Sequence, residues 1–127
     1  MGHSKAIQWG TYCGDFLEAT KWARKFKEHF GEDFYIEIQP NDIPEQHIAN
    51  KGAIRIAKQL GIELVATNDV HYTHQSDDFA HEVLLAMQVR KKMSDENRFK
   101  FPDNNFWLKS EEEMIETFDQ VDADIVR

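Results

Sequence analysis

The sequence is poor in several residue types, and each shortage excludes a class of protein. Its 127 residues include one cysteine, Cys13, which rules out an internal disulfide and a cysteine-based zinc site. No apolar run approaches the roughly 20 residues needed to span a bilayer. The N-terminus also lacks the basic segment and apolar core of a secretory signal. We therefore expect a single domain in a reducing, cytoplasmic setting.

Basic residues are too few for a protein that binds nucleic acid by itself. The chain has 15 lysines and arginines against 23 acidic residues, a formal net charge of −8. Surfaces that bind duplexes usually carry a basic footprint, and the densest basic cluster, at 90–92, is short. Tight, autonomous DNA binding is therefore not expected.

Two common catalytic motifs are also missing. Gly52 and Gly61 are too isolated for a glycine-rich phosphate loop, and no Gly-x-Ser-x-Gly elbow occurs. Cys13 has no assigned base, which disfavours a thiol nucleophile. The remaining composition, 41% hydrophobic and 30% charged, is that of a soluble globular protein.

Hydrophobic periodicity predicts alternating helices and strands, and hence an α/β fold. The expected elements are a helix over 15–30, a strand over 34–39, a helix over 42–60, a strand over 62–68, a helix from 76 or 77, a small hairpin or paired extended segment over 99–108 and a helix from 110. Asp42 with Glu45, and Ser110 with Glu113, have the form of capping boxes. Gly61 is placed for a left-handed cap.

The apolar periods also predict which helix faces point inward. For the helix that begins at 76 or 77 these are Phe79, Ala80, Val83, Leu84 and Met87. For the last helix they are Met114, Ile115 and Phe118. The first two strands, with one helix between them, favour a parallel βαβ unit. Because ligands gather where parallel strands end, Gln39 and the residues after the second strand should face one mouth.

Those residues include an Asp-x-His pair. Asp69 and His71 follow the apolar run that begins at Leu64. On a strand, residues two apart share a face, and a carboxylate beside a neutral imidazole suits zinc or manganese. The alternative is that Asp69 caps the next turn and His71 is an ordinary loop residue.

Two further residues are candidate ligands. Glu37 alternates with the isoleucines of the first strand, so it points into a barrel interior if those isoleucines meet the helices, and into solvent at an exposed edge. His74, three residues beyond His71, either approaches the same metal or stays in a loop. His81 is expected to be half-buried without a ligand role.

Taken together, these motifs resemble one family. The matching stretches, in the family's order and with little insertion, are 30–39, 43–46, 64–72, 80–85, 94–99 and 108–114. They resemble the C-terminal portion of the PHP (polymerase and histidinol phosphatase) domain in bacterial replicative polymerases, the DNA polymerase III alpha subunits. The resemblance covers about residues 15–120.

The resemblance implies a distorted seven-stranded α/β barrel with metals at one mouth, and phosphoesterase or 3′–5′ exonuclease-type chemistry. Of the family's metal motifs only the last maps here, onto Asp69 and His71. The N-terminal His-x-His motif has no counterpart, and the context of Cys13 does not match the family's ligand cysteine. The resemblance thus implies a partial PHP domain over 15–118, an unassigned segment over 1–14 whose start resembles a vector-derived tail, and the start of a linker over 119–127.

Three hypotheses follow for function. The first is a fragment of the metal-dependent domain of a replicative polymerase, inactive alone because zinc sites normally use three or four protein ligands. It would reach DNA and replisome subunits through its parent, and open sheet edges would favour self-association. The second is a non-catalytic module that braces the polymerase. The third is a free-standing metallohydrolase, which needs another ligand such as Glu37 or His74.

Overall fold

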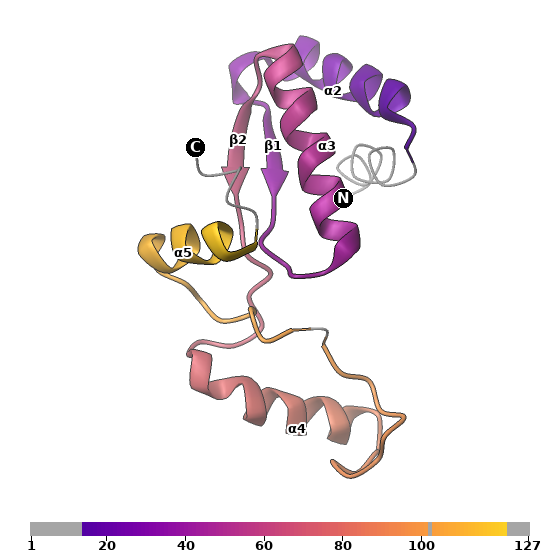
Figure 1. Ribbon diagram of the computed structural model, residues 1–127, viewed down its shortest axis with the longest axis vertical. Coiled ribbons are helices and arrows are strands. Elements are labelled where there is room, and N and C mark those ends of the chain that lie inside the picture. The colour runs from indigo at the N-terminus through magenta and orange to yellow at the C-terminus, as the bar shows by residue number, and fades with distance from the viewer. Residues whose placement is uncertain (1–13, 102, 122–127) are drawn as a thin grey trace.

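The computed structural model describes residues 14–101 and 103–121, which form helices and one small sheet (Figure 1). The elements, in chain order, are α2 (Phe16–Phe30), the 3-10 turn η1 (Gly31–Asp33), β1 (Tyr35–Ile38), α3 (Pro44–Leu60), β2 (Glu63–Ala66), the 3-10 turn η2 (Gln75–Asp77), α4 (Asp78–Gln88) and α5 (Glu111–Val121). This mixture agrees with the predicted α/β class. The predictions for Cys13 and for most of the linker, at 122–127, lie outside the described residues.

The sheet confirms the predicted parallel pair. Tyr35 lies opposite Glu63, and Ile38 lies opposite Ala66. The backbone N–H of Thr67 extends the pairing by donating to the Ile38 carbonyl at 3.0 Å. In the described part of the chain the sheet has these two strands, and α3 connects them. Both strands therefore end at the same edge, as the sequence predicted.

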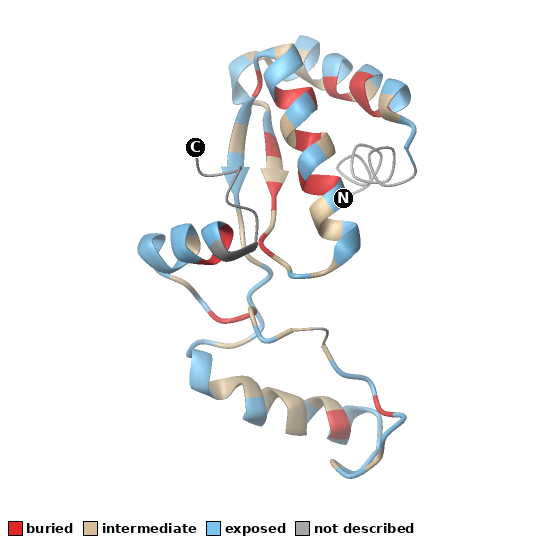
Figure 2. Cartoon of the chain, viewed as in Figure 1, coloured by how far each residue is buried: buried red, intermediate tan, exposed pale blue. Residues whose placement is uncertain are grey.

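The core lies where α2 and α3 pack on one face of β1 (Figure 2). Ile36 and Ile38 point into it and are each 4% exposed, while Ile56 of α3 is fully buried. Alanines on both helices, Ala19, Ala23, Ala53 and Ala57, allow close approach of the backbones. Phe118 of α5 joins the same cluster, so the last helix is anchored at the ends of the strands.

Two helix ends lie where the capping residues predicted them, at Gly61 and Ser110, and the first helix begins at the predicted place. Asp15 Oδ1 accepts from the Glu18 N–H at 3.1 Å and starts α2. Gly61 ends α3 at φ 61° and ψ 45°, the left-handed conformation. At α5, Ser110 Oγ accepts from the Glu113 N–H at 3.3 Å, and Glu113 Oε2 accepts from the Ser110 N–H at 2.8 Å. The second capping box is therefore confirmed.

The first capping box, Asp42 with Glu45, is wrong. Helix α3 begins at Pro44, and Ile43 in the cap position makes no side-chain cap bond. Proline favours the first helical position because its φ is already helical and its missing N–H is not needed there. That places Asp42 one residue too early to cap. Its Oδ1 instead lies 3.0 Å from His47 Nε2.

Of the two alternatives predicted over 99–108, the structure shows the paired extended segment and not the hairpin. The segment at 106–108 pairs in parallel with the segment after β2, through a bridge between Tyr72 and Trp107. The His71 N–H donates to the Phe106 carbonyl at 2.8 Å, and the Leu108 N–H donates to the Tyr72 carbonyl at 3.0 Å. A short alternating stretch fits any strand-like neighbour, and here the neighbour lies about 35 residues earlier in the chain.

The predicted inward face of α4 points outward. Phe79 and Met87 are each 66% exposed and Leu84 is 61% exposed, whereas Ala86 is buried. The helix lies apart from the α2–α3–sheet core (Figures 1 and 2), and its apolar stripe is not part of the hydrophobic cluster described there. The prediction for α5 holds for Phe118, whereas Ile115 is 46% exposed. Among the helices described, none combines the length and apolarity that a membrane span requires.

Candidate functional site

The segment after β2 carries the candidate ligands, but it is not a strand. Strand β2 ends at Ala66, three residues before Asp69. Beyond it, Asn68 Nδ2 donates to the Trp107 carbonyl at 2.7 Å. On the C-terminal side of His71, Tyr72 forms a β-bridge with Trp107. The premise that Asp69 and His71 share the face of a strand is therefore wrong, because the pairing with 106–108 positions them.

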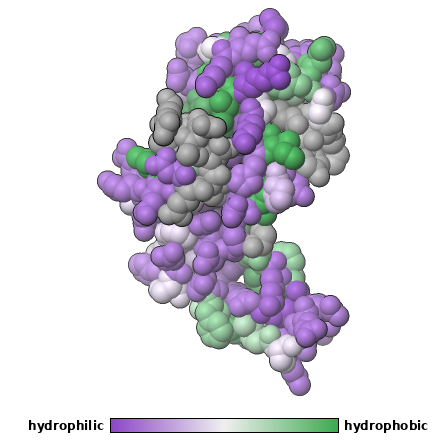
Figure 3. All heavy atoms as spheres, viewed as in Figure 1, coloured by the Kyte–Doolittle hydropathy of each residue, from purple (hydrophilic) through white to green (hydrophobic). Residues whose placement is uncertain are grey.

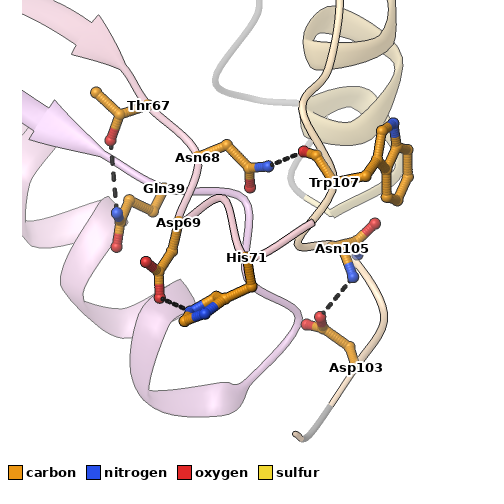
Figure 4. Close-up of polar contacts among 8 residues, drawn as sticks. All are labelled: Gln39, Thr67, Asn68, Asp69, His71, Asp103, Asn105 and Trp107. Carbon is orange, nitrogen blue, oxygen red and sulfur yellow. Dashed lines mark hydrogen bonds and ion pairs between the residues drawn. The ribbon is translucent and has the colours of Figure 1, made fainter. Parts of the chain in front are cut away.

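Asp69 and His71 nevertheless meet. Asp69 Oδ2 lies 3.1 Å from His71 Nε2, and their side chains are 54% and 34% exposed (Figure 4). Carboxylate and imidazole ligands bind zinc at about 2.0–2.2 Å, so two of them lie roughly 2.9–3.4 Å apart at bond angles of about 90–109°. The observed separation matches that span. An ordinary hydrogen bond between aspartate and histidine has the same separation, so the distance is compatible with both a hydrogen bond and two adjacent positions on one divalent metal.

Aromatic rings surround His71 on its other side. Its centroid lies 4.8 Å from that of Phe101, 5.5 Å from Phe106 and 5.5 Å from His81. His81 in turn stacks on Phe101 at 5.2 Å with an interplanar angle of 14°. Burial, and then the neighbouring His71, lower the pKa of His81 below its usual value. This cluster holds the His71 ring in place and favours a neutral His81.

The sequence predicted His81 to be half-buried, which is confirmed, but it did not reveal the contact with His71. Ten residues and a turn separate the two histidines, and Phe101 lies 20 residues further on. No local spacing encodes such a contact. The alternation of Phe99, Lys100 and Phe101 was the available signal, and it indicated a hairpin or a paired extended segment instead.

Glu37 lies on the face of β1 opposite the buried isoleucines and is half-buried. Its Oε1 accepts from the Thr67 hydroxyl at 2.5 Å. Gln39 Nε2 donates to the same hydroxyl at 3.5 Å (Figure 4). The Glu37 carboxylate thus belongs to a polar network across the two strand ends, and its contact there is with Thr67 and not with the Asp69–His71 pair.

His74 caps η2. Its ring accepts from the Asp77 N–H, and its own backbone N–H donates to Asp77 Oδ2 at 2.9 Å. The ring lone pair that a metal would require is therefore used locally. Over residues 14–101 and 103–121, no three His, Cys, Asp or Glu side chains gather as a metal-binding group.

Comparison with known proteins shows that the chain is similar to a short part of longer polypeptides. No protein-family model matches the chain. It is 41% identical over 104 residues, 74% of its length, to the DNA polymerase III subunit alpha of Aquifex aeolicus. It is 49% identical over 89 residues to that of Deinococcus radiodurans and 43% identical over 102 residues to that of Treponema pallidum, matches that cover 70% and 80% of the chain. The chain spans only 7–9% of the length of these relatives.

Proposed function

We propose, from the premise that this chain is a fragment of a DNA polymerase III alpha subunit, that it supplies two ligands of a divalent-metal site in the complete subunit. The observation that carries the proposal is the 3.1 Å contact between Asp69 Oδ2 and His71 Nε2, next to the edge where both parallel strands end. The relatives support the premise because they match 70–80% of the chain at 41–49% identity. Through that subunit the chain would serve cytoplasmic DNA replication.

The finer assignment is to the PHP domain, over residues 15–118. The order of the matching motifs supports it, as does the position of Asp69 and His71 after the second strand. Zinc or manganese held there would supply Lewis-acid chemistry for phosphate-ester cleavage of the exonuclease type. Asp69 and His71 would orient the ion, and the aromatic rings behind His71 would limit the movement of one ligand.

The isolated chain would bind metal weakly and catalyse nothing. Tight zinc sites use three or four protein ligands, and both Glu37 and His74 contact other partners. The remaining ligands would come from the rest of the subunit. Its strands would also cover the outer edges of β1 and β2, which in the isolated chain would favour self-association.

A second function is favoured by the packing of His71. Its ring contacts Phe101 and Phe106, its backbone N–H donates to the Phe106 carbonyl, and Asp69 pairs with its Nε2. These contacts are sufficient for a purely structural role. In that case Asp69 and His71 pin the 106–108 segment, and the chain braces the polymerase without binding metal.

Calorimetric titration with zinc, and then with manganese, separates the two functions. The matched control is a second Asp–His pair: Asp42 Oδ1 lies 3.0 Å from His47 Nε2 at the start of α3. We expect binding weaker than about 1 μM that disappears in Asp69→Ala/His71→Ala and persists in Asp42→Ala/His47→Ala. Binding that is absent, or equal in the two variants, would favour the structural module. Binding tighter than 1 μM would mean a third ligand and a self-sufficient metallohydrolase.

A further inference from the structure

The ligand arc, residues 68–72, is held at both of its ends by one residue, Trp107. At the N-terminal end, Asn68 Nδ2 donates to the Trp107 carbonyl at 2.7 Å (Figure 4). At the C-terminal end, Tyr72 forms the parallel bridge with Trp107. Asp69 and His71 therefore lie in a short loop whose two ends are fixed on the same residue.

The two ends of the arc are held by different kinds of group. At the C-terminal end the backbone does this: the Tyr72 N–H donates to the Phe106 carbonyl at 3.3 Å, and the Leu108 N–H donates to the Tyr72 carbonyl at 3.0 Å. These bonds do not use the carbonyl of Trp107, which is the atom that the Asn68 amide contacts. The N-terminal end therefore depends on a side chain, which a substitution can remove without touching the bridge.

Trp107 provides a rigid base for the arc. It is 8% exposed, and its neighbour Phe106 is 3% exposed. The Lys109 ammonium lies 3.5 Å from the centroid of the Trp107 ring and donates to the Asn105 carbonyl at 2.6 Å. A hydrogen bond to the Trp107 carbonyl therefore fixes the Asn68 side chain relative to a buried segment.

Apolar packing does not hold the first part of the arc. Asp69 and Val70 are exposed, and the surface between the sheet and α4 is largely hydrophilic on the face shown in Figure 3. The phenylalanine rings contact His71, towards the other end of the arc. The Asn68 amide is therefore the group that ties the chain next to Asp69 to the 106–108 segment.

We propose that Asn68 is a positioning residue: its amide clamps the arc on Trp107 and thereby holds Asp69 and His71 at a separation compatible with one divalent metal. Ligands that are fixed before the metal arrives lose less conformational freedom on binding. The clamp is a property of the metal-free chain, whereas its effect on metal affinity rests on the proposed metal-binding function.

Two substitutions of Asn68 separate its hydrogen bond from its shape. Asn68→Leu keeps the branched shape and removes the donor, whereas Asn68→Gln keeps the amide on a longer side chain. In the described part of the chain, Asn68 Oδ1 is buried without a hydrogen-bond partner, so leucine forfeits a single hydrogen bond and the variant should fold. Thr20→Val is the matched control, because it removes a bond of equal length, 2.7 Å, from Thr20 Oγ1 to the Phe16 carbonyl on α2.

Backbone ¹⁵N relaxation of the metal-free chain tests the clamp itself. We expect the order parameters of Asp69 and Val70 to fall from about 0.85 toward 0.6 in Asn68→Leu, to fall less in Asn68→Gln, and to stay unchanged in Thr20→Val. The Leu108 N–H should keep its protection from hydrogen exchange, because the bridge remains. Unchanged order parameters in Asn68→Leu would overturn the proposal. Loss of protection at Leu108 would also overturn it, since Asn68 would then hold the whole segment and not one end of the arc.

Zinc titration, followed through the ring resonances of His71, tests the consequence for binding. We expect the dissociation constant to rise at least about fivefold in Asn68→Leu, less than about twofold in Asn68→Gln, and not at all in Thr20→Val. Equal affinity in Asn68→Leu and the unchanged chain would overturn the positioning role. A chain that binds no zinc would contradict the proposed function instead, and the order parameters would then decide the clamp.

Discussion

Asp69 Oδ2 and His71 Nε2 meet at 3.1 Å although the strand before them has already ended. The pairing of the next residues with 106–108 holds this geometry, and two phenylalanine rings support the imidazole. One histidine thus serves both as a candidate ligand and as a packing residue. A substitution at His71 would therefore change the local stability together with the proposed metal affinity.

The packing role predicts a stability change at His71. His71→Ala removes ring contacts with Phe101 and Phe106, each worth about 0.5–1.5 kcal/mol for aromatic pairs. We expect the free energy of unfolding to fall by about 1–2 kcal/mol in urea titrations followed by tryptophan fluorescence. His47→Ala should cost about 0.5 kcal/mol or less, since that pair is exposed on the Asp42 side. Equal losses for the two variants would show that the rings around His71 contribute no stability.

The core between α2, α3 and β1 predicts a larger effect at Ile56. This side chain is fully buried, and Ile56→Ala leaves a cavity that should cost about 2–5 kcal/mol. Ile48→Ala on the same helix is the control, because Ile48 is 49% exposed and should cost less than about 1 kcal/mol. Chemical denaturation of both variants measures the difference. Similar costs would mean that the helix does not pack on the sheet as described.

The end of α3 predicts a backbone effect at Gly61. Its φ of 61° lies in the left-handed region, where a residue with a Cβ costs about 1–2 kcal/mol. Gly61→Ala should therefore destabilise the chain by about 1 kcal/mol in thermal or urea unfolding. Gly61→Asn should lose less because asparagine tolerates this conformation. If alanine and asparagine were equivalent, the left-handed cap would be refuted.

The lowered pKa of Lys109 should make the free energy of unfolding depend on pH in the alkaline range. Burial lowers its pKa to about 8, although the carboxylates of Asp103 and Glu113 oppose the shift. Between about pH 8 and 10.5, the ordinary pKa of lysine, the unfolded chain therefore binds more protons than the folded chain. The contribution of Lys109 to the free energy of unfolding thus rises with pH across that window.

Lys109→Met should remove that rise, and urea midpoints measured from pH 7 to 10.5 will show it. The ammonium also lies 3.5 Å from the Trp107 ring centroid and donates to the Asn105 carbonyl at 2.6 Å, so the tryptophan fluorescence should report the titration directly. A lysine that titrates at 10.5 in the folded chain would contradict the prediction.

Local chemistry allowed the α/β class and the order of helices and strands to be predicted from the sequence. Asp15, Gly61 and Ser110 set helix ends through contacts within four residues. The predicted cap at Asp42 was wrong because Pro44, two residues later, occupies the first helical position. The apolar stripe of α4 was recognised, but a stripe does not say whether its partner lies within the same chain.

The site was predictable only in part, because some of its contacts join residues that lie far apart in the sequence. The spacing of Asp69 and His71 identified the pair, although a non-strand segment brings the two together. His81 and Phe101 were missed as neighbours of His71 because their contacts join residues 10 to 30 positions apart. Contacts of that separation depend on tertiary packing and leave no period in the sequence.

The most direct test of the metal proposal follows the histidine rings themselves. Long-range ¹H–¹⁵N spectra of the chain during zinc addition resolve His71 from His47, whose Asp–His separation is nearly the same. The account predicts that the His71 Nε2 resonance moves with zinc concentration, that it does not move in Asp69→Ala, and that the His47 ring remains unchanged. A His71 ring that stays unchanged, or that moves no more than His47, would contradict a metal-binding role for this pair.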